Sequence, residues 1–178
     1  MNISYFNEET PIMESIFKRR SIRKYKDKND EKEKIEKLLK AATAAPSAGN
    51  EQPWHFIVIR DRDKLNHLAE VHPYAKMLKE APLAIAVCAD LDKQRHEGFW
   101  VQDCAAATQN ILLEAVSLDL GAVWIGAYPN QEREKVVSEA LEVPKNIKTV
   151  SLISIGYPDE EKGKTDRLSD EIVHYDKW

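Results

Sequence analysis

FWVQDCAAATQNILLEAVSL, residues 99–118, is the stretch of sequence that decides the fold. Its apolar side chains fall on nearly every side of a helix and include Val101, Cys104, Ala105, Ile111, Leu112 and Ala115. A helix that is apolar almost all round is buried almost all round. We therefore predict a long helix at the centre of the fold, with Gly121 as its C-terminal cap.

The segments that flank this helix predict the strands of a sheet. LAIAVCA (83–89) is nearly all apolar, which is typical of a strand buried on both faces. Three further strands are predicted at HFIVI (55–59), at AVWIGAY (122–128) and from Thr149 to Pro158.

Five shorter helices are predicted from caps and from apolar periodicity. The first begins at Pro11 after Thr10 and ends near Arg19, and the second begins after Asn29 or Asp30 and stops at Pro46. The other three run from Asp61 to Ala69, from Tyr74 to Glu80 and from Asn130 to Pro144. Helices interleaved with four strands predict an α+β or α/β fold, in which the long helix packs on a mixed sheet. The 178 residues leave room for one domain, 1–178.

Composition disfavours several classes of protein. The formal net charge of −4 provides no field for a polyanion, so nucleic-acid binding is not expected. No apolar run approaches the ~18 residues of a membrane span. The segment MNISYFNEETP (1–11) has neither the positive nor the apolar region of an export signal, which predicts a cytoplasmic protein. Cys88 and Cys104 lie in apolar segments without metal-ligand spacing, so we expect buried, reduced thiols.

The familiar catalytic motifs are absent from the sequence. The five histidines show no metal-ligand spacing, and there is no GxSxG, GxxxxGK[ST] or GxGxxG. Neither a metal enzyme nor covalent catalysis is expected. Polar binding groups without an acid, base or nucleophile indicate that a bound cofactor carries the reaction.

A basic cluster interrupts this acidic chain at RRSIRKYKDK, residues 19–28. Guanidinium groups and a neighbouring hydroxyl are the donors that hold a phosphate. Arg19, Arg20, Ser21 and Arg23 are therefore candidate ligands. Alternatively, the cluster only complements the dipole at a helix C-terminus.

The other candidate residues are weaker on their own. Ser47, Asn50 and Gln52 bring hydroxyl and amide groups to a tight loop, where they either meet a planar heterocycle or only form the turn. Gly126 would let a backbone N–H approach a ligand closely. Alternatively, the glycine at the end of this strand only allows the chain to turn. Trp54 either stacks on a ligand or belongs to the core.

The last twenty residues are polar and charged until IVHYDKW, residues 172–178. This ending is aromatic and β-branched, which predicts an extended arm. Because the tail itself cannot bury these side chains, we expect a homodimer in which the arm docks on the partner. Lys164 and Arg167 in the same tail either reach a phosphate or are simply solvated.

Six stretches of the chain carry a recognisable pattern. They are RRSIRKY (19–25), APSAGNEQPWHFIV (45–58), DCAAATQNILLEA (103–115), LGAVWIGAYP (120–129), SIGYP (154–158) and DRLSDEIVHYDKW (166–178). In order and spacing they resemble the FMN-dependent nitroreductase family. The resemblance implies an α+β fold with a mixed, mainly antiparallel sheet flanked by helices. It also implies an obligate homodimer that exchanges its C-terminal arms and holds one FMN per subunit at the interface.

The resemblance assigns a set of flavin contacts but no catalytic side chain and no metal ligand. Arg19 is similar to the arginine that binds the phosphate, Ser21 to a hydroxyl near the phosphate or ribityl chain, and Arg23 to the basic residue near flavin N1. The 46–50 loop resembles one that contacts the flavin in part from the partner subunit, and residues 125–127 resemble the segment that passes N5. The implied set is Arg19, Arg20, Ser21, Arg23, Pro46, Ser47, Ala48, Asn50, Ile125, Gly126, Ala127, Lys164 and Arg167.

The activity implied by this resemblance is a ping-pong transfer of hydride. NADH or NADPH would reduce the flavin at N5, and a nitroaromatic, a quinone or a related small oxidised substrate would then take two electrons. A positive charge near N1 stabilises the reduced flavin. The alternative is a protein that binds FMN for storage or redox sensing without turnover, and the family resemblance does not name a substrate.

Overall fold

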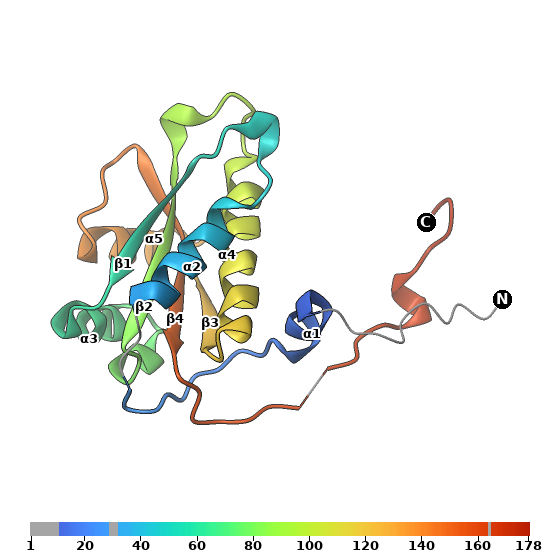
Figure 1. Cartoon of the computed structure of the whole chain (residues 1–178). Helices are drawn as coiled ribbons and strands as arrows, with labels where there is room; N and C mark the ends of the chain where they lie inside the picture. The colour runs from blue at the N-terminus through green and yellow to red at the C-terminus, as the bar shows by residue number, and fades with distance from the viewer. Residues whose placement is uncertain (1–10, 29–31, 164) are drawn as a thin grey trace.

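Four strands form one sheet at the centre of the molecule (Figure 1). The computed structural model describes residues 11–28, 32–163 and 165–178. The strands are β1 (Trp54–Ile59), β2 (Leu83–Asp90), β3 (Gly121–Gly126) and β4 (Ile147–Gly156), in the spatial order β1-β2-β4-β3. All three strand pairs are antiparallel. The one parallel element among the described residues is the isolated bridge between Ser21 and Ala122. The predicted α+β fold is confirmed.

The helices cover both faces of this sheet. They are α1 (Pro11–Lys18), α2 (Lys32–Thr43), α3 (Arg62–Val71), α4 (Trp100–Ser117) and α5 (Gln131–Ala140), with 3-10 turns at Ala48–Asn50, Lys76–Lys79, Leu91–Lys93 and Asp170–Ile172. One buried cluster joins α2 and α4 to the sheet, and a second joins α3 and α5 to its other face. None of the helices in the described ranges is long and apolar enough to cross a bilayer.

Strand β2 separates the two buried clusters. Leu83, Ile85 and Val87 belong to the cluster under α2 and α4, whereas Ala84 and Ala86 belong to the cluster under α3 and α5. All five side chains are fully buried. The prediction of a strand buried on both faces is therefore confirmed. One face carries large apolar side chains and the other carries alanines.

The long helix α4 lies where the sequence predicts it. Of its 18 residues only Gln102, Gln109 and Ser117 are exposed. Inside the protein the Thr108 hydroxyl hydrogen-bonds the Ser151 hydroxyl of β4 at 2.8 Å, so that a polar pair joins helix and sheet within an apolar layer. The two cysteines are free and buried, and burial raises the thiol pKa of Cys88 to about 11.

Two helix caps are confirmed and one is wrong. Asp61 accepts a hydrogen bond from Lys64 N–H at 2.8 Å, and Asn130 accepts one from Arg133 N–H at 3.0 Å. Gly121 does not cap α4. Asp119 takes the left-handed conformation there with φ 58°, and Gly121 is instead the first residue of β3.

One predicted helix is shorter in the structure, and the predicted start of another is not described. The helix expected from Tyr74 to Glu80 is only the 3-10 turn Lys76–Lys79. The residues before Lys76 make the hydrogen bonds of a turn and not those of an α-helix. The cap expected at Asn29 or Asp30 lies outside the described residues.

The segment 19–25 docks on the free edge of β3. Ile22 N–H donates to the Ala122 carbonyl at 3.0 Å, and the Tyr25 hydroxyl donates to the carbonyls of Ile22 (2.8 Å) and Ser154 (3.2 Å). Burial raises the pKa of Tyr25 well above its usual value, so the hydroxyl stays a donor. The basic cluster is thereby fixed beside the sheet.

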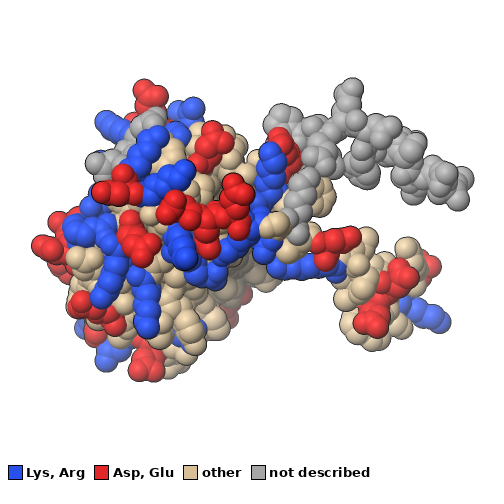
Figure 2. Space-filling model, turned by 90° about the horizontal axis from the view of Figure 1, so that it is seen from below, with Lys and Arg blue, Asp and Glu red and all other residues tan. Residues whose placement is uncertain are grey.

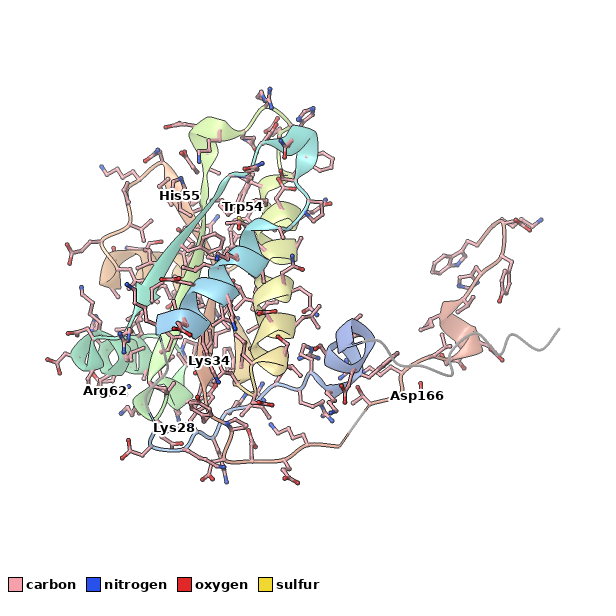
Figure 3. The ribbon with its side chains drawn as sticks, in the orientation of Figure 1. Lys28, Lys34, Trp54, His55, Arg62 and Asp166 are labelled. Atoms are coloured by element: carbon pink, nitrogen blue, oxygen red, sulfur yellow. The ribbon has the colours of Figure 1, made fainter. Side chains whose placement is uncertain are left out.

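The C-terminal tail lies apart from the sheet, on the side of α1 (Figure 1). Asp166, labelled in Figure 3, already lies on this outlying segment. Tyr175 and Trp178 are 83% and 99% exposed. The predicted arm is thus present, with its apolar residues uncovered in the single chain.

Gly121→Ala should destabilise the protein by about 1–3 kcal/mol, the usual cost of overpacking. A Cβ at this position would stand 2.6 Å from Ile22 Cγ2 and 2.8 Å from its Cβ, and a β-branched side chain cannot swing away. Chemical denaturation measures the loss. Gly163→Ala is the control, since no described atom lies within 4 Å of that Cβ. Equal midpoints for both variants and the wild type would contradict the close packing.

Candidate functional site

A pocket of ≈ 440 Å³ opens at the free edge of β3. Its lining includes Arg23, Tyr74, Met77, Trp124, Gly126 and Arg133. These residues come from the segment after α1, from the turn after α3, from β3 and from α5. The pocket therefore joins two of the regions singled out in the sequence, the basic cluster and the strand end at Gly126.

The backbone of Gly126 faces this pocket. Ala122 points its carbonyl to the free edge, where it accepts from Ile22, and residues two apart on a strand direct their backbone groups to the same side. Gly126 therefore presents its N–H and carbonyl at that edge. Within the described chain no atom lies within 4 Å of the position that a Gly126 Cβ would take. A flat ligand can approach this backbone without meeting a side chain.

His72 holds the Gly126 carbonyl. The imidazole is 1% exposed, and its Nε2 lies 3.3 Å from Gly126 O. Its Nδ1 accepts a hydrogen bond from Tyr74 N–H at 3.2 Å. Burial is the largest effect and lowers the pKa of His72; the hydrogen bond with the Gly126 carbonyl opposes it, and the nearby Arg133 adds a smaller lowering. The ring is therefore neutral near pH 7.

Cationic and aromatic groups form the pocket walls. Arg23, Lys76 and Arg133 line it, and the Arg133 guanidinium stacks on the Tyr74 ring at 4.7 Å. Tyr74 is 61% and Trp124 37% exposed. Flat apolar surfaces beside positive charge suit an extended heterocycle that carries or develops negative charge.

The basic segment is anchored from the opposite end of the chain. Arg23 N–H donates to Glu160 Oε1 at 2.5 Å, and Lys162 Nζ donates to the Ser21 carbonyl at 2.6 Å. The hydrogen bond from Arg23 N–H and the nearby Lys162 ammonium lower the pKa of Glu160 despite its partial burial. Arg20 does not line the β3 pocket but a neighbouring one of ≈ 510 Å³ that includes Glu160 and Lys162. Arg19 and Ser21 are half-buried on the same segment.

Lys28 of the basic cluster and Arg62 of α3 make contacts outside the β3 pocket. Figure 2 shows charges of both signs interspersed over the lower face of the molecule. Lys28 places its ammonium 3.7 Å from the centre of the Tyr157 ring, and Arg62 caps the carbonyls of Leu78, Lys79 and Ala81. Figure 3 labels Lys28 and Arg62 at this lower end.

The loop 46–50 does not line the β3 pocket within its own protomer. Ala48 N–H donates to the buried Asp103 of α4 at 3.0 Å. Ser47 Oγ accepts from Gln52 N–H at 3.0 Å, and Asn50 Oδ1 accepts from the Gln52 amide at 2.9 Å. These side chains therefore form the turn, one of the two roles considered for them, and Pro46 stays exposed.

The remaining predicted residues are dispersed. Ile125 and Ala127 are 3% and 1% exposed; Ile125 lines the pocket, and Ala127 N–H donates to the Val150 carbonyl at 3.2 Å. Arg167 lies on the exposed tail, and Lys164 lies outside the described residues. Trp54 is a core residue at 7% exposure, which confirms the second interpretation of that residue.

Comparison with known proteins decides the family. The family model described as "Nitroreductase family" matches residues 16–72 and 66–157. The chain belongs to the nitroreductase family. An Archaeoglobus fulgidus protein with the provisional name NADH dehydrogenase/NAD(P)H nitroreductase is 50% identical over 171 residues, which cover 93% of this chain and 98% of that protein.

Two solved structures match this nitroreductase-family chain along most of its length. The FMN-dependent nitroreductase of Clostridium difficile is 39% identical with a TM-score of 0.86, and covers 92% of this chain and 98% of its own. A provisionally named nitroreductase of Desulfovibrio desulfuricans, solved in complex with FMN, is 31% identical with a TM-score of 0.84, and covers 96% and 99%. The expected nitroreductase-like fold is confirmed.

Sequence reasoning missed a second polar anchor in this nitroreductase-family protein. The Glu51 carboxylate is inaccessible to solvent and its Oε1 accepts from Arg95 N–H (2.9 Å), His96 N–H (2.8 Å) and His96 Nδ1 (2.7 Å). The His96 ring lies over Gly49, where a Cβ would come within 2.6 Å of it. One carboxylate thus ties the 90–99 segment to the 46–51 loop.

Glu51 makes stability depend on pH. Burial by itself raises the Glu51 pKa, but the hydrogen bonds from His96 and Arg95 outweigh it, so the pKa lies below its ordinary 4.5. The stabilising effect is thus complete above pH 4.5 and is lost as pH falls through the folded-state pKa. We expect the melting temperature of Glu51→Gln to fall less than that of the wild type between about pH 5 and pH 3.

Glu97→Gln removes an exposed carboxylate from the same segment and serves as the control. Its acid profile should follow the wild type. If the profile of Glu51→Gln does so too, Glu51 is not the acid-sensitive anchor.

Proposed function

We propose that this protein transfers two electrons as hydride from NADH or NADPH, by a ping-pong mechanism, to a small oxidised substrate such as a nitroaromatic or a quinone. The single observation that carries the proposal is the side-chain-free backbone of Gly126 beside Arg23, in a pocket with aromatic walls. As a member of its family the chain is an NAD(P)H-dependent FMN oxidoreductase.

The residues of the pocket fit FMN, the cofactor of the related structures. When bound, FMN supplies the two-electron chemistry that no side chain of the chain offers. Gly126 would present its N–H to the ring near N5, and Arg23 would stand near N1. Arg19 and Ser21, with Arg20 beside them, would hold the phosphate and ribityl groups.

Each of these groups has a physical task. The Arg23 charge would stabilise the negative charge that develops on two-electron reduction. The Gly126 N–H would orient the acceptor atom, and the stacked pair of Tyr74 and Arg133 bounds the pocket where a flat nicotinamide or substrate would enter. Because solvent can supply protons, no side-chain acid is required.

We place the site at the interface of a homodimer. The 46–50 loop does not line the pocket of its own protomer, so the partner's copy would supply it, together with Arg167 and Lys164 from the arm. An apolar groove between α1, α2 and α4 lies next to the exposed Ile16 and Phe17 and offers the surface for pairing. An interface of this kind would also cover the arm.

The test of function is direct. The purified protein should show a flavin absorption spectrum, release FMN on denaturation, and oxidise NADH or NADPH with 4-nitrobenzoate or benzoquinone, giving parallel double-reciprocal plots. Bound FMN without turnover would favour the alternative of a storage or redox-sensing protein. Protein that binds no flavin would refute both.

Arg19→Ala should weaken FMN binding by roughly 30- to 150-fold. Losing one charge-assisted contact with a phosphate costs about 2 to 3 kcal/mol. Titration of the apoprotein with FMN measures the dissociation constant. Lys24→Ala, an exposed cation of the same segment, is the control and should bind like the wild type. Equal FMN dissociation constants for all three proteins would mean that the basic cluster only complements the dipole of a helix C-terminus.

Arg23→Gln should lower the two-electron reduction potential of the bound flavin while the oxidised cofactor stays bound. A loss of ~1.4 kcal/mol in stabilising the reduced form corresponds to about 30 mV. Potentiometry on the flavin absorption gives the midpoint. An unshifted midpoint would mean that Arg23 faces solvent. A loss of oxidised FMN as large as that of Arg19→Ala would mean that Arg23 binds the phosphate.

Deletion of residues 171–178 should give a protein that is monomeric, flavin-poor or unstable. The deletion removes the aromatic end of the arm, including Tyr175 and Trp178. Light scattering gives the mass and absorbance the flavin content. A folded, flavin-loaded truncated monomer would contradict the proposed role of the arm.

A further inference from the structure

We propose that His72 is a positioning residue of this site, whose Nε2–H fixes the orientation of the Gly126 peptide at the pocket. The inference rests on the function proposed above, because it concerns the backbone that would meet the cofactor. No metal-ligand pattern in the sequence includes His72, and the mechanism does not use it as an acid or base.

The hydrogen bonds of the ring define its tautomer. Tyr74 N–H donates to Nδ1 at 3.2 Å, which requires an unprotonated Nδ1. The proton of the neutral ring is therefore on Nε2, which lies 3.3 Å from the Gly126 carbonyl. Nε2–H donates, and the carbonyl accepts.

Gly126 needs such a partner for two reasons. It ends an edge strand, so its outward carbonyl has no neighbouring strand to bond. Glycine also lacks the side chain that restricts other residues to few backbone conformations. Immediately after it, Ala127 and Tyr128 both direct their N–H groups to the Val150 carbonyl at 3.2 Å. The bond from His72 fixes Gly126 at the point where the chain turns back toward β4.

His72 is itself rigidly held. It caps α3, with its N–H donating to the Leu68 carbonyl at 3.1 Å. Leu65 and Leu68 of the same helix are fully buried against the sheet. The His72 ring thus connects the buried helix α3 to the Gly126 carbonyl. The same ring holds Tyr74 at the rim of the pocket.

Two substitutions separate the two hydrogen bonds. A glutamine amide nitrogen reaches the place of Nε2, so His72→Gln keeps a donor for Gly126 and loses the acceptor for Tyr74. An asparagine oxygen reaches the place of Nδ1, so His72→Asn keeps the Tyr74 contact and loses the Gly126 contact. Each variant is the matched control of the other.

The expected results differ in kind. His72→Asn should lower the rate constant of flavin reduction at saturating NADH or NADPH by about 10- to 100-fold, the scale of an ångström-size misplacement, with KM little changed. His72→Gln should keep that rate constant within about twofold, and raise KM because Tyr74 is freed. Equal losses in the two variants, or none in His72→Asn, would overturn the proposal.

Two readouts do not need the loaded enzyme. In the apoprotein, the backbone amide NMR signals of Gly126 and Ala127 should shift in His72→Asn and stay near the wild-type positions in His72→Gln. The ¹⁵N shifts of the wild-type imidazole should report protonated Nε2, and protonated Nδ1 would overturn the proposal even if both variants fail to fold. If the wild type binds no FMN or shows no turnover, the proposed function fails while these measurements still test His72.

Discussion

The free edge of β3 is the constraint on which the rest of the site depends. An edge strand presents backbone donors and acceptors that must find partners or remain open to solvent. In this chain Ile22 N–H donates to the Ala122 carbonyl at one end of β3, and His72 Nε2–H donates to the Gly126 carbonyl at the other. Between these two contacts Trp124 is exposed while Val123 and Ile125 are buried, and the pocket forms there.

The electrostatics of the pocket follow from which neighbours are charged. Arg23, Lys76 and Arg133 bring positive charge to the pocket, whereas His72 is kept neutral by burial and by Arg133. A protonated ring would lose the acceptor that holds Tyr74. The neutral ring can therefore donate to the Gly126 carbonyl and accept from Tyr74 N–H at the same time.

Local patterns in the sequence predicted most of the fold and part of the site. Asp61 and Asn130 cap their helices as expected, because a cap depends on residues three apart. The prediction that Gly121 caps α4 was wrong, because Asp119 adopts the left-handed conformation at the end of that helix. Arg23 and Gly126, two of the predicted site residues, line one pocket, whereas His72, Glu51 and Glu160 were not predicted. Their partners lie 54, 45 and 137 residues away, and only the fold brings such groups together.

The two faces of β2 carry side chains of different size. Ala84 and Ala86 share one buried cluster with Leu65 and Leu68 of α3, so large side chains of the helix lie over small ones of the strand. His72 follows directly from α3 and inherits the position of that helix. A larger side chain at Ala84 or Ala86 would press on α3, and a strand that contributes none of the pocket lining would thereby disturb the imidazole that contacts Gly126.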